Sequence, residues 1–490
     1  MSSRFARAAA CCVFVAILAR PTESALGDGQ PYLVKDINPT GFSAPIYLTK
    51  VGDRLFFNAD DGVHGQELWV SDGTEEGTYM VIDLVLGPDG STPQRIVDLN
   101  GFSLFQADSS FNNLDWYITD GTTAGTVRVG DLHTDSPPIS PGCSFRSYYA
   151  ERAGDVVFFL GEDATHGTEL WKTDGTAQGA ALLKDIVPGP LDTAIQSLTG
   201  VEEMLFFSAS GLNLWRSDGT TEGTIKLTTN VGTIGTTDVN GTAFFVGEEA
   251  TTGKELWVSD GTPEGTHMVK DINPGQNPST PNYLTNVNGT LYFLAFSPGP
   301  GRELWKSDGT EEGTVMVVDL NPSGSSGAYE LTNVGGTLFF ARFDSIEGWQ
   351  LWKSDGTWEG TVLVKLIGPT TVSGPEFLTP VNGKLYFSAD DGVHGTELWV
   401  SDGTPWGTFM IADTTPGPGN HAPWIPVGVG FTLFYAATDG VHGQELWAFD
   451  TRDPNIPALS SIGVVVMSAV LLGLGAAIIR MRTAWNRDHG

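Results

Sequence analysis

The sequence has little cysteine and little positive charge. Its 490 residues include 3 Cys and 26 Lys+Arg against 58 Asp+Glu, for a formal net charge of −32 at pH 7. This charge repels phosphate backbones, so no nucleic-acid partner is expected. Cys11 and Cys12 lie in an N-terminal apolar run, which leaves Cys143 as the single cysteine of the body. The fold must therefore be stabilised by packing and not by an internal disulfide.

Short catalytic motifs are also lacking. There is no G-x-S-x-G turn, no H-E-x-x-H pair and no Walker loop. The acidic residues that stand out do so by repeating, whereas catalytic groups usually interrupt a repeat. A binding or catalytic loop is therefore expected in the irregular stretches 108–115 and 137–143, because insertions in a repeat form surface loops.

The two ends of the chain differ from the body. Residues 1–25 are predicted to be a secretory signal peptide, because Arg4 and Arg7 precede an apolar run of residues 8–19 that is too short to span a bilayer. An uncleaved N-terminal anchor is the alternative. Residues 461–480 are predicted to form a transmembrane helix.

A linker at 451–460 precedes this helix, and a basic cytoplasmic tail at 481–490 follows it. The motif at 456–460, Ile-Pro-Ala-Leu-Ser, resembles the start of the bacterial IPTL-type sorting signal. That resemblance implies a tail that is cleaved in the membrane, and a permanent anchor is the alternative. Either way, the body is predicted to be exported and held at the cell envelope or cell surface.

The body is a repeat. The string ELWVSDGTEEGT of residues 67–78 recurs in variants whose aspartates are 42 to 54 residues apart. In the second unit Trp116 is shifted by one place, and Tyr117 stands where the other units carry tryptophan. Over residues 31–450 the chain resembles the bacterial ELWxxDGT-repeat proteins. This resemblance implies a secreted or surface β-repeat architecture, with no established enzymatic activity.

One unit, residues 267–308, shows the expected strands. HMVKDI, YLTNV, TLYFLAF and ELWKSD are strand-like, and Asn288-Gly289 suits a two-residue hairpin turn. Four short strands per unit of about 47 residues are typical of a β-propeller blade. The longest link follows KDI, so each blade should end on that strand.

The mature chain begins with a lone strand at 32–37 and ends with a unit that lacks one. The N-terminal strand should therefore complete the last blade. The predicted fold is an all-β propeller of about nine four-stranded blades. Eight blades and an open β-solenoid are the alternatives.

The tryptophan of ELW recurs in eight units. Packing between blades is the favoured interpretation, and a ring of sugar-stacking platforms is the alternative. The recurring residues are Trp69, Trp171, Trp215, Trp257, Trp305, Trp352, Trp399 and Trp447.

The SDGT turns carry aspartates that can accept backbone N–H bonds, while Gly73 and Gly77 are expected to take left-handed dihedrals. Calcium binding is the weaker alternative, because Ca²⁺ prefers oxygen ligands. The weak calcium candidates are Asp72, Asp260, Asp308, Asp355 and Asp402. No other cofactor is expected.

Two further residue types recur. Histidines in D-G-V-H-G loops are interpreted as turn residues and not as metal ligands, because neighbouring blades separate them. They are His64, His394 and His442, with His166 at the same place in unit three. Glutamates open the ELW strands and should make hydrogen bonds across strands or blades. They are Glu67, Glu169, Glu255, Glu303, Glu397 and Glu445.

Together these features predict a monomeric, surface-anchored propeller that acts as a non-enzymatic binding module for a glycan, a protein or a matrix component. An extracellular hydrolase or lyase with its site at the mouth of the propeller channel is one alternative. A purely structural surface protein is the other. Acidic or histidine side chains that belong to single units and cluster at that mouth would favour the enzyme.

Overall fold

The protein is described from a computed structural model. The described residues are 29–108, 114–129, 150–163, 165–176, 180–211, 213–229 and 231–452. The predicted signal peptide (1–25), membrane helix (461–480), basic tail (481–490) and Cys143 lie outside them. In the described part all regular structure is β-strand, and no helix there could span a bilayer. The membrane helix therefore remains a prediction.

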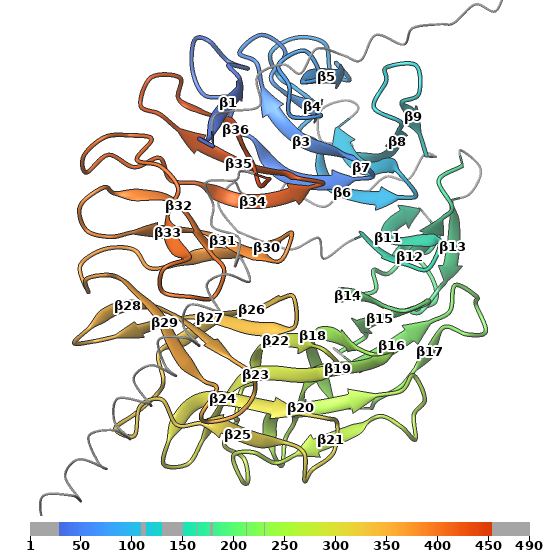
Figure 1. The fold of residues 1–490 in the computed structure, drawn as a ribbon. Helices are drawn as coiled ribbons and strands as arrows, with labels where there is room; N and C mark the ends of the chain where they lie inside the picture. The colour runs from blue at the N-terminus through green and yellow to red at the C-terminus, as the bar shows by residue number, and fades with distance from the viewer. Residues whose placement is uncertain are drawn as a thin grey trace, which may run out of the picture.

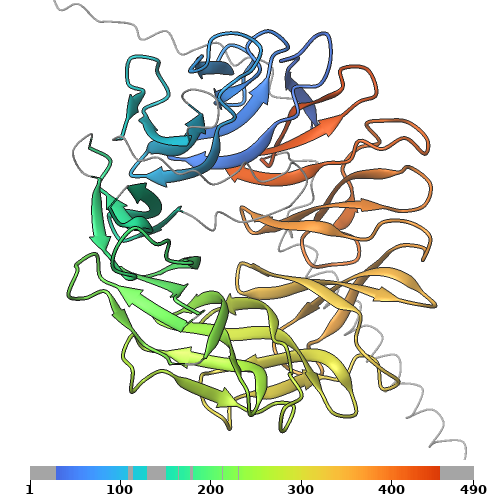
Figure 2. The ribbon, with the colours of Figure 1, turned by 180° about the vertical axis from the view of Figure 1, so that it is seen from behind.

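Nine four-stranded antiparallel sheets surround a common axis (Figures 1 and 2), which confirms the nine-bladed propeller. Blade 1 consists of β2–β5, each of blades 2 to 8 takes the next four strands, and blade 9 combines β34–β36 with β1. The innermost strands are β2 (Ile46–Val51), β6 (Gln94–Leu99), β10 (Ala150–Ala153), β14 (Gln196–Val201), β18 (Gly232–Val239), β22 (Asn282–Val287), β26 (Ala328–Val334), β30 (Glu376–Val381) and β34 (Trp424–Val429). Each contacts the innermost strand of both neighbouring blades, which closes the ring.

The two middle strands of each blade are the most buried. The second strands are β3 (Arg54–Asp60), β7 (Phe102–Asp108), β11 (Val156–Asp163), β15 (Met204–Ala209), β19 (Thr242–Glu249), β23 (Thr290–Ser297), β27 (Thr337–Asp344), β31 (Lys384–Asp390) and β35 (Thr432–Thr438). The third strands are β4 (Gln66–Ser71), β8 (Leu114–Thr119), β12 (Gly167–Thr173), β16 (Asn213–Ser217), β20 (Gly253–Ser259), β24 (Gly301–Ser307), β28 (Gly348–Ser354), β32 (Thr396–Ser401) and β36 (Gln444–Asp450).

The outer strands are short, except in blade 7. They are β5 (Tyr79–Ile82), β9 (Val127–Arg128), β13 (Ala181–Lys184), β17 (Ile225–Lys226), β21 (His267–Lys270), β25 (Val315–Val318), β29 (Val362–Gly368), β33 (Thr408–Met410) and β1 (Tyr32–Lys35). The chain then crosses to the next blade, as the long Asn-Pro-Gly links predict. The crossover between β21 and β22, for example, spans residues 271–281.

The N-terminal strand closes the ring. β1 pairs antiparallel with β36, with Tyr32 opposite Ala448, so the predicted closure of the last blade is confirmed. The contact between β1 and the turn of blade 1 has the same form as the contacts between other neighbouring blades. Lys35 Nζ donates to the carbonyl oxygen of Thr78 (2.8 Å), as Lys270 Nζ does to that of Thr314 (2.9 Å). The first and last strands of the propeller are thus paired in one blade, and the eight-bladed and open-solenoid alternatives are wrong.

The hydrophobic core is divided into nine clusters, one at each interface between adjacent blades. Each ELW tryptophan packs against the preceding blade. Trp257 of blade 5, for example, lies with Phe206 and Leu214 of blade 4. In blade 2, Tyr117 takes this place. It pairs with Phe105 as Trp69 pairs with Phe57.

Candidate functional site

The SDGT turns are closed by their own side chains. Asp308 Oδ1 accepts from Thr310 N (2.9 Å) and Thr310 Oγ1 (2.8 Å), and Thr310 Oγ1 accepts from Gly313 N (2.9 Å). Gly73 is left-handed (φ 95°), but Gly77 is not, so the expectation for Gly77 is wrong. Gly77 is needed for space, because a Cβ atom there would lie 2.0 Å from the Asp72 carboxylate.

The calcium candidates are spread over separate blades. In each one, Oδ1 accepts hydrogen bonds from the threonine two residues later, as in Asp72, Asp260, Asp308, Asp355 and Asp402. Among the described residues, no three His, Cys, Asp or Glu side chains group in a way that could hold a metal ion. Calcium binding stays an untested prediction.

The recurring glutamates hold the crossovers between blades. Glu255 accepts from Ile272 N (3.0 Å), Ser279 N (2.9 Å) and Ser279 Oγ (2.6 Å), all in the link from blade 5 to blade 6. Glu445 makes the same set of bonds with Ile37 and Ser43 across the closing seam. A buried carboxylate that binds three donors orders a loop without regular structure.

Burial raises the pKa of these glutamates above the ordinary value. For Glu67 and Glu303 the pKa is raised to about 7, and the same desolvation raises it for Glu169, Glu255, Glu397 and Glu445. Because this environment repeats with the blade, it belongs to the scaffold. It does not single out one acid for catalysis.

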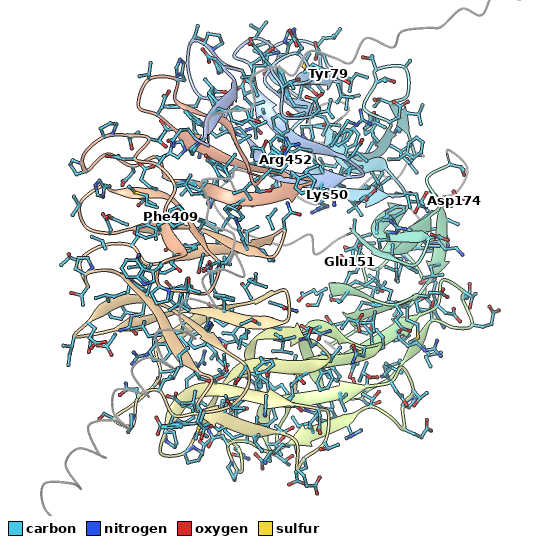
Figure 3. All side chains as sticks on the ribbon, in the orientation of Figure 1. Lys50, Tyr79, Glu151, Asp174, Phe409 and Arg452 are labelled. Atoms are coloured by element: carbon cyan, nitrogen blue, oxygen red, sulfur yellow. The ribbon has the colours of Figure 1, made fainter. Side chains whose placement is uncertain are left out.

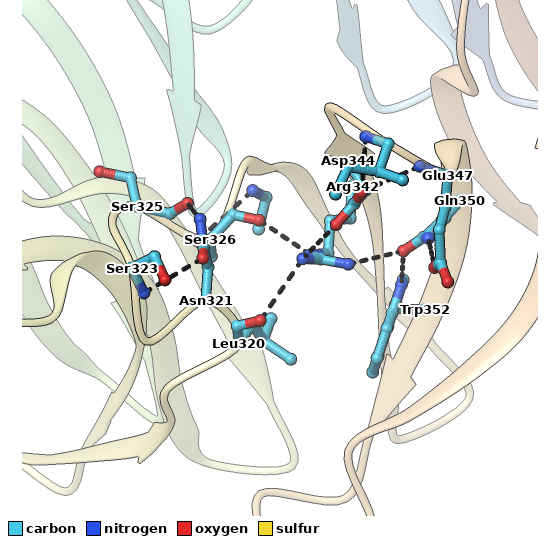
Figure 4. A network of polar contacts seen from close by, with 12 residues as sticks. Leu320, Asn321, Ser323, Ser325, Ser326, Arg342, Asp344, Glu347, Gln350 and Trp352 are labelled. Atoms are coloured by element: carbon cyan, nitrogen blue, oxygen red, sulfur yellow. Dashed lines mark hydrogen bonds and ion pairs between the residues drawn. The ribbon is translucent and has the colours of Figure 1, made fainter. Parts of the chain in front are cut away.

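Blade 7 departs from this pattern. Gln350 stands where other blades carry the glutamate, and the buried Arg342 binds the preceding crossover, which Glu303 of blade 6 also holds (Figure 4). Arg342 Nε donates to Ser326 O (2.9 Å), and its Nη1 donates to Gln350 Oε1 (2.8 Å), which also accepts from Trp352 Nε1 (2.7 Å). Asp344 neutralises the guanidinium at 3.0 Å. The network thus adds a buried guanidinium to the crossover between blades 6 and 7, whereas the crossover after blade 7 accepts hydrogen bonds from Trp349 and Tyr329.

The D-G-V-H-G loops each fix their histidine locally. His64 Nδ1 lies 2.7 Å from Asp61 Oδ2, and His442 Nδ1 lies 2.6 Å from Asp439 Oδ2. The neighbouring carboxylate raises the pKa of both histidines. Beside His442, a cavity of about 400 Å³ separates this loop from the N-terminal crossover that carries Asp36 and Phe42. The histidines remain within single blades, as the turn interpretation expects.

A ring of bulged residues surrounds the axis where the crossovers enter the innermost strands. In every innermost strand but one, the described residue four places before the strand's end has a positive φ. Positive φ disfavours all residues but glycine, yet side chains of very different kinds occupy this place. These rim residues are Tyr47, Arg95, Ser197, Gly235, Tyr283, Glu330, Phe377 and Ile425. The corresponding residue of blade 3, Tyr149, lies outside the described residues.

Adjacent rim residues interact with one another. Burial raises the pKa of the Tyr47 hydroxyl, while Arg95 of the next blade lowers it. Glu330 acts on Tyr283 in the opposite sense and raises its pKa further than burial does alone. Glu330 also accepts from Leu378 N of blade 8 (3.0 Å), directly beside Phe377. The rim is therefore a continuous arc across blades 6, 7 and 8.

The two rim tyrosines are the most accessible of the large rim side chains. Tyr47 is 37% exposed and Tyr283 is 44% exposed, whereas Arg95, Glu330 and Phe377 are half-buried. Lys50 and Glu151, on the innermost strands β2 and β10, border the centre of the ring (Figure 3). Aromatic, cationic, anionic and aliphatic groups thus share one backbone position around the axis.

The sequence interpretation did not identify the rim. It directed attention to stretches 108–115 and 137–143. Residues 109–113 and all of 137–143 lie outside the described residues. The only available signal was the variable residue directly before the recurring L-T-x-V segment. The bulge leaves no residue preference at that place except for the glycine at Gly235.

The fold and these sites define the chain as a closed nine-bladed β-propeller with a repeated scaffold and a varied rim. No family model matches the sequence, and no curated protein matches it either. Membership of the ELWxxDGT-repeat family is therefore still a prediction.

Several solved structures share parts of the fold. A puromycin hydrolase is 16% identical over 63% of this chain and 52% of its own, with a TM-score of 0.38. A prolyl endopeptidase is 12% identical over 75% and 55%, with a TM-score of 0.41. The computationally designed protein Ika8 is 13% identical over 74% and 98%, with a TM-score of 0.39. The chain spans about half the length of the two enzymes, and likenesses this distant carry no functional argument.

Proposed function

We propose that the protein is a non-enzymatic binding module, exported and anchored at the cell surface, that recognises its ligand at the rim. The carrying observation is that eight blades hold a left-handed residue at one place and differ in the side chain they present. Strained backbone that recurs while side chains vary suits a recognition surface, because such strain clusters at ligand sites.

The composition of the rim supports a ligand with both apolar faces and hydrogen-bonding groups. Tyr47, Tyr283 and Phe377 offer aromatic surface, while Arg95 and Glu330 offer one charge of each sign. Aromatic rings with a few fixed polar groups are typical of ligand sites. The scaffold of repeated contacts would hold these side chains in place before the ligand arrives, which lowers the entropic cost of binding.

A ligand array with the full-length protein tests this proposal. Glycans, peptides and matrix polymers are immobilised, with and without calcium, and each retained ligand is then measured against the triple variant Tyr47→Ala, Tyr283→Ala and Phe377→Ala. Binding should fall at least tenfold. Phe102→Ala is the matched control, because this exposed aromatic lies on the hairpin at the opposite end of β6. Equal binding by the triple variant would exclude the rim.

One observation favours an enzyme as the second candidate. Burial raises the pKa of Glu330, and the nearby Glu376 raises it further. Neither carboxylate belongs to the repeat, and a pair of neighbouring carboxyl groups, one of them with a raised pKa, is what glycoside hydrolysis uses. Release of reducing sugar from neutral glycans, lost in both Glu330→Gln and Glu376→Gln, would support this activity. Unchanged release in either variant would oppose it.

A further inference from the structure

Two tryptophans on neighbouring turns are far more exposed than the other tryptophans discussed above. Trp358 lies between β28 and β29 of blade 7 and is 68% exposed. Trp406 lies between β32 and β33 of blade 8 and is 88% exposed. In the other SDGT turns the two variable places hold no aromatic residue. They hold Glu75-Glu76, Thr123-Ala124, Ala177-Gln178, Thr221-Glu222, Pro263-Glu264 and Glu311-Glu312.

Both indoles are carried by an ordered backbone. In blade 7, Thr357 donates its N–H and its hydroxyl to Asp355 Oδ1 (2.9 and 2.7 Å) and accepts from Gly360 N (2.9 Å). Asp402 and Thr404 make the same bonds in blade 8. A large apolar ring on a rigid turn loses little conformational freedom when it binds a partner. The turn does not need either indole for its own closure.

The two turns belong to one surface. Lys365 of β29 donates through Nζ to Thr408 O (2.6 Å) and approaches Pro405 O (3.5 Å), the residue before Trp406. β29 itself follows the turn of Trp358 and exposes Val362 and Leu363. The tryptophan surface is defined as Trp358, Val362, Leu363 and Trp406. It lies on the outer side of blades 7 and 8, whereas the rim surrounds the axis.

Charge decides which partner suits this surface. Locally the charges cancel. The two turns and the strands β28 and β29 carry three carboxylates and two ammonium groups, and Lys306 of blade 6 adds a third ammonium group by donating to Gly356 O (2.9 Å). These residues are Asp355, Glu359, Asp402, Lys306, Lys353 and Lys365. The chain as a whole carries −32, which opposes anionic polymers and a second copy of the protein. An uncharged partner meets no such repulsion. Pyranose rings combine a flat C–H face, which stacks on indole, with hydroxyls that remain in water.

We propose that the tryptophan surface binds a neutral polysaccharide by stacking of its sugar rings on Trp358 and Trp406. This site is separate from the rim, so the two can be tested apart. The neighbouring position of the indoles on adjacent blades suits a chain of several sugar units better than a single sugar, because two contacts on one chain reinforce each other.

Affinity electrophoresis of the full-length protein tests the proposal. The gels contain mixed-linkage β-glucan, xyloglucan or galactomannan, and alginate and chitosan serve as charged counterparts. At least one neutral polymer should retard the wild type. Trp358→Ala or Trp406→Ala should weaken the apparent affinity about tenfold each. Glu311→Ala and Glu264→Ala change the same turn places in blades 6 and 5 and should change nothing. Glu311→Trp should strengthen binding by adding a third indole.

Three results would overturn the proposal. The first is retardation by alginate or chitosan alone, and the second is equal retardation of wild type and the Trp358→Ala/Trp406→Ala double variant. The third is a dimer in light scattering that the double variant dissociates, with no glycan bound by the wild type. Because both indoles are exposed, the double variant should melt within a few degrees of the wild type, which separates lost binding from lost fold. The triple variant Tyr47→Ala, Tyr283→Ala and Phe377→Ala should bind the neutral polymer as the wild type does, because the tryptophan surface is separate from the rim.

Discussion

The interfaces between blades and the rim around the axis obey opposite rules. At the interfaces the residues repeat and the contacts repeat with them, as in the equal bonds of Glu255 and Glu445. At the rim only the backbone repeats, and the side chain changes from Tyr283 to Glu330 to Phe377 between successive blades. One region is constrained by packing, whereas the other is free to vary without loss of the fold.

This difference suggests how such a protein could acquire a ligand. Every interface must satisfy the same geometry for the ring to close, so a change there spreads to both neighbours. The rim residues belong to none of the nine hydrophobic clusters, so one of them can change without disturbing an interface. Stability and recognition are thereby assigned to different residues, and variants should separate them.

The largest effect is expected from removal of β1. Deletion of residues 29–37 would leave the outer edge of β36 unpaired and Glu445 without Ile37 N. An open sheet edge promotes aggregation, so the variant should fail to give a folded monomer in size-exclusion chromatography and circular dichroism. Fusion of residues 29–37 after Arg452, which restores the strand to β36, should recover the monomer. A stable monomer without β1 would contradict closure by this strand.

The next effect concerns the tryptophans between blades. Trp257→Ala should cost roughly 3–5 kcal/mol of unfolding free energy, because it leaves a cavity in the cluster between blades 4 and 5. Trp257→Phe should cost less, since the indole N–H of Trp257 makes no hydrogen bond. Trp399→Phe also removes the hydrogen bond from the indole N–H to Ala389 O (3.0 Å), so it should cost more unfolding free energy than Trp257→Phe. Denaturant titration measures all three, and equal losses would contradict this ranking.

A pH effect follows from the glutamates of the crossovers. The pKa of Glu303 is about 7 in the folded protein and ordinary in the unfolded chain, so the folded state binds more protons between these values. Its contribution to stability is therefore full below pH 4.5 and is lost as the pH rises through 7. The melting temperature should be higher at pH 5.5 than at pH 8, and Glu303→Gln should reduce the difference.

Glu255→Gln is the matched comparison for that experiment. Glu255 accepts three hydrogen bonds from the next crossover, and an amide group cannot accept at both of its heavy atoms. This variant should lower the melting temperature at either pH. A melting temperature that rises steadily from pH 5.5 to pH 8 in the wild type would show the sign to be wrong.

The smallest effect is expected at the rim. Ser197 has a φ of 55°, and glycine holds the same place in blade 5 as Gly235. Ser197→Gly should therefore change the unfolding free energy by no more than about 1 kcal/mol, in the stabilising direction, because glycine pays no steric cost there. Ser197→Val should destabilise the fold, since a β-branched side chain opposes this φ. Equal stability of both variants would show that the bulge is not strained.

Blade 7 shows how the scaffold tolerates an exception. It lacks the glutamate, and Arg342, Gln350 and Asp344 form a polar network beside the crossover from blade 6. Its outer strand β29 has seven residues, where all the other outer strands have four or fewer. The same blade carries Trp358 on its turn. Departures from the repeat thus gather where a surface role is proposed.

Much of the architecture was predictable from periodic residues. The nine units, the four strands of residues 267–308 and the closing strand at 32–37 follow from local strand patterns and link lengths, and the structure confirms them. The left-handed Asn288-Gly289 hairpin was predictable for the same reason. The role of Gly77 was not, because it depends on the position of the Asp72 carboxylate in three dimensions.

The sequence by itself predicted the four-stranded unit and which strand ends it, because those depend on contacts within one unit. It favoured nine blades over eight, and the closed ring decided between them. The tertiary structure alone decided what the repeated glutamates hold, that Arg342 joins Glu303 on one crossover, and that eight residues of seven kinds form one rim. Each of these depends on residues from different blades or on a backbone angle that the residue type does not predict. A bulge that accepts tyrosine, arginine and glutamate alike becomes visible only when the ring is closed.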